Sequence, residues 1–211
     1  MIEHQLRCLT NTLEMICTTI ALHFYRKQAS SFTADTAIFT ALLTIGFMMR
    51  NTSPIGWVPL ILIKILKQGS FPAFLKSGVL IALPLIGLCV YLDSLFYMHV
   101  NQQSEFRWTV TSLNFLNINV IQGLSKYFGD HAFTEYLCKF LVADIFRAYY
   151  PLLIMGMVSH AREQLSKRVE PEIEYMCSFY IIFFSLIGHK ETRFLLPILP
   201  LLFLVLGFQV Q

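Results

Sequence analysis

The chain has 211 residues, of which 55% are hydrophobic and 14% are charged, and its mean hydropathy is +0.59. Because soluble domains carry roughly a quarter charged residues, this composition excludes an ordinary soluble enzyme and indicates a helical membrane protein. The net charge of +3 is scattered between apolar runs, which excludes the basic stripe of a nucleic-acid-binding protein.

The N-terminal half contains three apolar runs separated by polar turns. Leu9–Tyr25 is just long enough to span a bilayer, whereas Thr36–Met49 and Ile55–Leu66 are shorter than the roughly 20 residues that a span needs. Pro54 cannot continue a helix from the preceding turn, which predicts a break between the two short runs. They are predicted to be two tilted helices or one re-entrant hairpin, and a single span across Thr36–Leu66 is the alternative.

The middle of the chain combines a clear span with a more polar segment. Val79–Met98 is predicted to be a spanning helix that follows a polar connector, Lys67–Gly78. Trp108–Ile121 mixes apolar residues with asparagines, which is typical of a segment that lies in the membrane interface with Trp108 in the aromatic belt.

The next run, Phe133–Val158, is apolar but carries four charged residues. They stand at helical spacing as two pairs of opposite charge, Glu135 with Lys139 and Asp144 with Arg147. Its first half is therefore predicted to lie in the interface, while Tyr149–Val158 enters the bilayer. With the two runs that follow, the chain is predicted to hold about six apolar helical segments.

A short polar island separates the last two apolar runs, Tyr175–Ile187 and Leu195–Phe208. Its ionisable residues are His189, Lys190, Glu191 and Arg193. Ionisable groups beside a bilayer are unfavourable unless they stay in water or take part in a function. The island therefore predicts either headgroup anchors that extend to the interface or a binding site.

Alternation of the runs across the membrane brings this island together with other polar clusters. If the first span runs from the lumen, or the exterior, into the cytosol, the cytosolic side receives a slight excess of basic residues, as the positive-inside rule expects. The opposite side then receives the polar residues that we predict to bind substrate. They are Asn11, Glu14, Arg50, His131, His189, Lys190, Glu191 and Arg193. The grouping requires two separate passes of the chain between Thr36 and Leu66.

These residue types suit a phosphate that is carried on a lipid. Arg50, Lys190 and Arg193 supply cations that stabilise the charge developing on a phosphate leaving group as a glycosyl bond breaks. His189 can donate to a phosphate oxygen or move a proton. The two glutamates can accept hydrogen bonds from sugar hydroxyls or orient the cations.

Each assignment also has a purely structural alternative. Glu14 can be a buried helix carboxylate that is satisfied by Asn11 or Arg7, and Arg50 can anchor the headgroup level. His131 can be an ordinary loop histidine. The tertiary arrangement has to decide between these roles.

The five cysteines give no sign of a disulfide framework or a metal site. They lie in or beside apolar runs, without a CxxC motif and without cysteine and histidine at ligand spacing. We predict that they are buried small hydrophobes, and the sequence predicts neither a metal nor another cofactor.

Several short motifs occur together in one order and cover most of the chain. They are Leu9–Glu14, Arg50–Thr52, Asp93–Tyr97, Asn114–Val120, Tyr127–His131, His189–Phe194 and Leu195–Pro200. In these motifs the sequence resembles the dolichyl-phosphate-mannose-dependent mannosyltransferases, glycosyltransferase family 22, and within them the GPI mannosyltransferase 3 branch. The His-Lys-Glu-Thr-Arg-Phe motif is specific to the wider family, and the Asn-Phe-Leu-Asn-Ile-Asn-Val stretch favours the GPI branch.

The resemblance implies an all-α, multispanning bundle of the GT-C type in the endoplasmic reticulum membrane, with its site facing the lumen. It implies transfer of mannose, with inversion, from dolichyl phosphate mannose to a lipid-linked glycan. In the GPI branch the product carries the third, α-1,2-linked mannose of the anchor precursor. A mannosyltransferase of the asparagine-glycan precursor is the alternative within the family.

The chain departs from the family pattern at both ends and in two motifs. The acidic loop with the family's general base is expected upstream of Met1, so no residue of this chain is assigned as the catalytic base. Asp130–Phe133 replaces a His-Pro-Trp run, and Met98–His99 replaces a glycine. Residues 1–211 are therefore predicted to be one partial transmembrane domain without the family's N-terminal catalytic loop and C-terminal region. A truncated, inactive membrane scaffold is the alternative.

Overall fold

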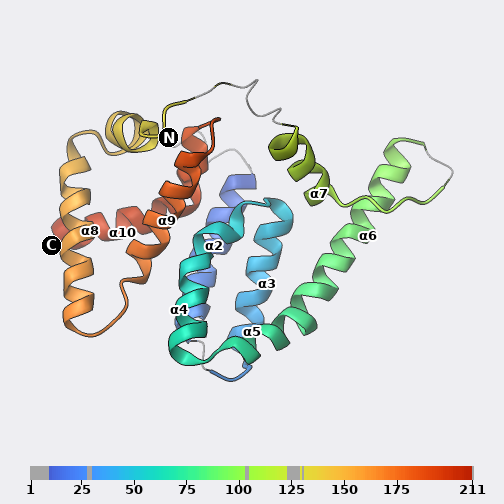
Figure 1. Cartoon of the computed structure of the whole chain (residues 1–211), viewed down its shortest axis with the longest axis horizontal. Helices are drawn as coiled ribbons and strands as arrows, with labels where there is room; N and C mark the ends of the chain where they lie inside the picture. Colours follow the sequence, from blue (N-terminus) through green and yellow to red (C-terminus); the bar gives the residue numbers. More distant parts are fainter. Residues whose placement is uncertain (1–9, 28–29, 103–104, 123–128, 130, 211) are drawn as a thin grey trace.

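The computed structural model describes residues 10–27, 30–102, 105–122, 129 and 131–210, and this part of the chain folds into helices without strands (Figure 1). The predicted all-α class is confirmed for these residues. The elements are α2 (Thr10–Lys27), α3 (Ala34–Met49), η1 (Ser53–Trp57), α4 (Val58–Gln68), α5 (Phe71–Ser77), η2 (Gly78–Ala82), α6 (Leu83–Val100), α7 (Thr111–Leu116), η3 (Asn117–Ile121), η5 (Tyr136–Phe146), η6 (Arg147–Tyr149), α8 (Tyr150–Ser166), α9 (Glu172–Leu186), η7 (Thr192–Ile198) and α10 (Leu199–Val210).

The two short apolar runs fold as separate antiparallel helices, α3 and α4 (Figure 1). The Thr33 hydroxyl caps α3 by accepting a hydrogen bond of 3.3 Å from the Thr36 amide. The helix ends at Arg50, whose extended backbone leads into the short helix η1, with Pro54 in its first turn. The predicted break is confirmed, and the alternative of a single span from Thr36 to Leu66 is wrong.

Three helices of the described part are long and apolar enough to cross a membrane: Phe71–Val100, Tyr136–Ser166 and Thr192–Gln209. Helix α3 is apolar but shorter. The first of the three begins at Phe71, within the predicted polar connector, because Pro72 is compatible with a first helical turn and the residues around Lys76 are mostly apolar. These lengths and compositions are consistent with the predicted helical membrane protein.

The continuous helix from η5 to α8 changes direction at Arg147, where η5 lies across the end of α8 (Figure 1). Arg147 has a left-handed backbone with φ of 48°. Of the two predicted ion pairs in this region, Glu135–Lys139 forms at 2.9 Å. Asp144–Arg147 is not among the ion pairs of the described residues, because the left-handed turn removes helical register. Instead, Arg147 Nε donates to the Ala143 carbonyl at 3.3 Å.

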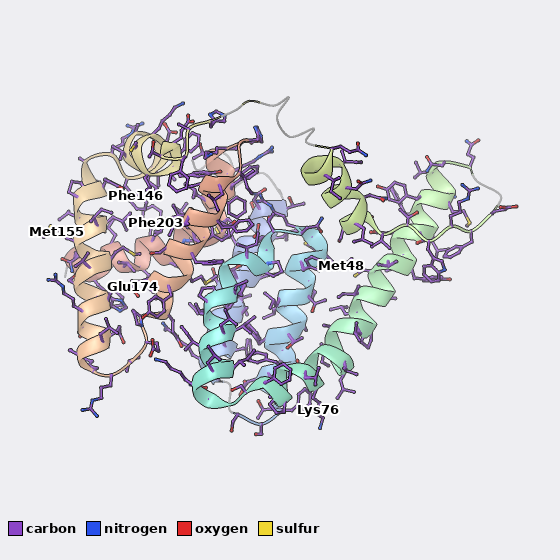
Figure 2. All side chains as sticks on the ribbon, viewed as in Figure 1. Met48, Lys76, Phe146, Met155, Glu174 and Phe203 are labelled. Carbon is purple, nitrogen blue, oxygen red and sulfur yellow. The ribbon has the colours of Figure 1, made fainter. Side chains whose placement is uncertain are left out.

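Aromatic side chains fill much of the core. Tyr25, Phe39 and Trp57 are almost fully buried where α2, α3 and η1 meet, with ring centroids 5.1 to 5.9 Å apart. On the other side of the molecule, Phe146 packs against Phe203 of α10 with centroids 5.1 Å apart (Figure 2). These contacts hold α2, α3 and η1 together at one place and η5 against α10 at another.

Gly156 allows α8 to approach α10 closely, so Gly156→Ala is expected to destabilise the protein. A Cβ at this position would lie 2.9 Å from the Val205 carbonyl oxygen and 3.0 Å from Gln209 Cγ. Separating two packed helices to relieve such contacts costs about 1–3 kcal/mol. Thermal unfolding of the purified protein in detergent should therefore show a lower midpoint for this variant.

The matched control is Gly207→Ala on the facing helix α10. No atom lies within 4 Å of a Cβ at Gly207, so alanine is expected to leave stability unchanged or raise it by about 0.5–1 kcal/mol. An equal effect of the two substitutions would show that the close approach at Gly156 does not hold α8 against α10.

Candidate functional site

The predicted site residues lie at one end of the helical bundle. This end is formed by the start of α2, the turn between α3 and η1, and the segment between α9 and η7 (Figure 1). Asn11 Nδ2 donates to the Arg193 carbonyl at 2.8 Å, and the His131 amide donates to the Gly188 carbonyl at 3.0 Å. The structure thus brings together groups that are far apart in the sequence.

Glu14 and Arg50 form a buried ion pair, with 3.3 Å between Glu14 Oε2 and Arg50 Nη1. The Glu14 side chain is fully buried, and the Arg50 side chain is 14% exposed, with its guanidinium carbon 4.6 Å from the centroid of the Phe194 ring. Glu14 is therefore a buried helix carboxylate. Its partner is Arg50 and not the expected Asn11, which instead donates to a backbone carbonyl. Arg7 lies outside the described residues. The Arg50 side chain thus faces Glu14 and Phe194 inside the protein.

Lys190 also points into the protein. Its residue is 3% exposed, and its ammonium donates to the Ile187 carbonyl at 2.6 Å and the His131 carbonyl at 3.2 Å. A lysine that binds the last carbonyls of a helix satisfies acceptors that have no intrahelical donor. Lys190 therefore joins the end of α9 to the loop that carries His131.

Two buried tyrosines hold the backbone of the polar island. The Tyr136 hydroxyl donates to the Glu191 carbonyl at 3.4 Å and lies 3.3 Å from the Glu191 amide, which donates to it. The Tyr180 hydroxyl donates to the Phe194 carbonyl at 3.0 Å. Sequence reasoning missed both residues. The only signal was that a buried tyrosine hydroxyl needs a hydrogen-bond partner.

With the backbone fixed in this way, three side chains of the island form a partly exposed network. Glu191 Oε1 lies 2.8 Å from His189 Nε2 and accepts a hydrogen bond of 2.7 Å from Arg193 Nη2. The exposed fractions of the side chains are 19% for His189, 30% for Glu191 and 42% for Arg193. Burial raises the pKa of Glu191, but the hydrogen bonds and charges of His189 and Arg193 outweigh burial and hold this pKa below its ordinary value. Glu191 is therefore ionised and fixes the orientation of Arg193.

His131 extends this network on one side. Its Nδ1 lies 2.8 Å from Glu135 Oε2, and its ring centroid is 6.3 Å from that of His189. The side chain is 29% exposed, so His131 is a loop histidine that borders the island. Three other residues of the predicted motif around His131 lie outside the described residues: Tyr127, Phe128 and Asp130.

Two further motifs connect α6 and α7 to the site. Asn51 Nδ2 donates to the Ser112 carbonyl at 3.3 Å, which joins the turn after Arg50 to α7. The Thr111 hydroxyl donates to Asp93 Oδ2 at 2.7 Å, which joins α7 to α6. The motif residues thus place α7 between α6 and the turn that follows Arg50.

This arrangement can bind an anion or a sugar through groups that are already oriented. Arg193 has one edge of its guanidinium fixed by Glu191, and its side chain is 42% exposed, so its remaining N–H groups can donate to a phosphate or hydroxyl oxygen. His189 lies next to it and can donate or accept a proton. In the part of the chain that the structure describes, no group of three or more His, Cys, Asp or Glu residues could hold a metal ion.

The whole chain, residues 1–211, matches the model of the Alg9-like mannosyltransferase family. It is 28% identical over 204 residues to the GPI alpha-1,2-mannosyltransferase 3 of Xenopus laevis and 24% identical over 205 residues to the human protein of that name. It is 31% identical over 200 residues to the GPI mannosyltransferase 3 of Candida albicans.

These matches cover 96%, 97% and 93% of this chain, respectively, but only 35%, 34% and 36% of the relatives. The chain therefore spans about a third of the length of the curated relatives it matches. No solved structure gives a significant match.

Proposed function

The chain belongs to the Alg9-like mannosyltransferase family, and we propose that it forms the substrate-binding part of a GPI α-1,2-mannosyltransferase. The donor is dolichyl phosphate mannose, and the acceptor is the lipid-linked GPI precursor, which receives its third mannose. The protein is a multi-pass protein of the endoplasmic reticulum membrane, and the site faces the lumen. Residues 1–211 contribute a partial transmembrane domain of the GT-C type, and the general base comes from another part of the protein.

Within this proposal, the eight predicted residues divide into two groups by burial. His189, Glu191, Arg193 and His131 are partly exposed and contact the substrate. The others are buried or bind backbone groups and hold the exposed side chains in place: Asn11, Glu14, Arg50 and Lys190. This division gives every predicted residue a physical role without placing all the cations on the phosphate.

The observation that carries the proposal is the exposed guanidinium of Arg193 on a rigid backbone. Asn11 and Tyr180 bind the carbonyls of Arg193 and Phe194, so the segment is fixed before substrate arrives. A fixed donor can stabilise the negative charge that grows on dolichyl phosphate as the bond to mannose breaks, without reorganisation. His189 adds a donor to the same oxygens or passes a proton.

The direct test is mannose transfer by cells that lack their own GPI mannosyltransferase 3. The protein is expressed from its complete reading frame, and microsomes are supplied with labelled dolichyl phosphate mannose. We expect the two-mannose GPI precursor to be converted to a three-mannose product. The same microsomes without the expressed protein are the control and should accumulate the two-mannose precursor.

Two other results would contradict the proposal. Label that enters the asparagine-glycan precursor instead would assign the protein to the other branch of the family. An abundant protein that transfers no mannose to either acceptor would identify it as an inactive membrane scaffold.

A further inference from the structure

A cavity of about 150 Å³ opens beside Arg193, between η5 and the start of η7 and α10. Its polar lining residues are Asp144, Thr192 and Arg193, and the rest of its wall consists of Ile145 and three leucines. At roughly 30 Å³ per water molecule, this volume corresponds to about five waters. This is the scale of one sugar ring.

Asp144 has no role in the site described so far. It is an exposed carboxylate of the helix Tyr136–Ser166, in the half that is predicted to lie in the membrane interface. Arg147, its predicted partner, binds the Ala143 carbonyl instead, and Asp144 forms none of the ion pairs of the described residues. The charge of Asp144 acts on Lys139, whose ion pair is with Glu135, but Asp144 holds no ion pair with it. The position of Asp144 together with Arg193 in the wall of the cavity points to a ligand that both side chains can bind.

The side chains that line the cavity indicate which chemical class of ligand it can bind. A carboxylate accepts hydrogen bonds from hydroxyl groups, and a guanidinium donates to hydroxyl or ring oxygens. A phosphate in the cavity would be repelled by Asp144, and a cation would be repelled by Arg193. A purely apolar chain would give the Asp144 carboxylate no hydrogen-bond donor. A neutral polyol satisfies both side chains, and the aliphatic wall suits the C–H face of a sugar ring.

We propose that Asp144 and Thr192, together with Arg193, form a subsite for one hexose ring of the substrate. The Asp144 carboxylate accepts hydrogen bonds from one or two hydroxyl groups of the ring, and the Thr192 hydroxyl forms a further hydrogen bond on the same polar side of the cavity. The ring is either the mannose of the donor or a mannose of the acceptor glycan, which share this chemistry. The inference rests on the proposed function and deepens it.

The kinetic test uses Asp144→Asn in the microsomal transfer assay. Because this substitution removes a charged acceptor for sugar hydroxyls, it is expected to raise one KM about tenfold. The affected KM is that for dolichyl phosphate mannose if the subsite holds the donor sugar. It is that for the GPI precursor if the subsite holds the acceptor sugar. The matched control is Glu163→Gln, an exposed carboxylate of the following helix α8 that pairs with Lys167 and should change neither KM. Unchanged KM values for both substrates in the Asp144→Asn protein would overturn the inference.

A second test reads occupancy without catalysis. In a Thr192→Cys variant, a small maleimide should label the new thiol, and labelling at that peptide should slow when a sugar fills the cavity. The probes are dolichyl phosphate mannose, dolichyl phosphate without mannose, and the mannosylated GPI precursor. An Ala143→Cys variant, one residue before Asp144 and outside the cavity wall, should be labelled without protection.

Protection by a mannosylated probe but not by dolichyl phosphate supports a hexose subsite and identifies its source. Equal protection by dolichyl phosphate and dolichyl phosphate mannose would overturn it in favour of the lipid phosphate. A protein that transfers no mannose, yet shows sugar-specific protection, would contradict the proposed function while keeping the subsite. An active protein that no mannosylated probe protects would keep the proposed function and contradict the hexose subsite.

Discussion

Replacing Arg193 by alanine is expected to lower the rate of mannose transfer by about 10²–10³-fold, the effect of removing one fixed donor from a developing anion. The side chain is 42% exposed, and the contact with Asn11 uses the Arg193 carbonyl, so alanine should not unfold the segment. Initial rates in microsomes, normalised to protein abundance, measure the effect. His189→Ala should likewise abolish complementation of a GPI-mannosylation defect while the protein remains abundant.

A second substitution at the same position tests whether the planar shape of the guanidinium matters in addition to its charge. Arg193→Lys keeps the charge but loses the planar fork that Glu191 holds through Nη2 and Nε, so only partial activity is expected. Arg26→Ala is the matched control, because Arg26 is an exposed arginine paired with Glu172 at the far end of α2. Normal complementation by both Arg193→Ala and His189→Ala would remove these residues from the substrate site.

Glu14→Ala is expected to be the most destabilising of the substitutions considered. It leaves Arg50, whose side chain is 14% exposed, without its counter-charge inside the bundle. An uncompensated buried charge costs about 3–5 kcal/mol. Thermal unfolding in detergent and steady-state abundance in membranes should both fall clearly for this variant.

A double substitution separates the charge from the packing. Glu14→Leu combined with Arg50→Met replaces the pair by apolar side chains and should recover most of the lost stability. Glu172→Ala removes the partner of Arg26 in a pair whose arginine is 52% exposed, and should cost less than about 1 kcal/mol. A double variant as unstable as Glu14→Ala alone would show that the ion pair is not what the bundle requires.

The His-Lys-Glu-Thr-Arg-Phe motif therefore has two functions in one short segment. Lys190 and Phe194 face the protein, where one binds helix-end carbonyls and the other lies against Arg50. His189, Glu191 and Arg193 form the exposed network. Because the buried members position the exposed ones, substitutions in either group are expected to reduce transfer, but only the buried group should also reduce stability.

Several features of the fold could be predicted from the sequence because they depend on local chemistry. The helices follow from apolar runs, and the end of α3 follows from Pro54, which restricts the preceding backbone. The pair Glu135–Lys139 follows from helical spacing alone. The sequence also identified the polar segments that meet at one end, since alternating helices must return there.

The tertiary structure decided which partner each polar group has and which side chains reach solvent. Asn11 and Arg193 are 182 residues apart, and no local pattern predicts that one binds the carbonyl of the other. The same holds for the pair Glu14–Arg50. Arg147 shows most clearly where sequence spacing fails to predict a contact. Its backbone has a positive φ that interrupts the helix, so the predicted ion pair with Asp144 does not form, and Asp144 lies in the wall of a cavity instead. Sequence spacing defines neighbours only while the helix continues, and long-range packing determines the rest.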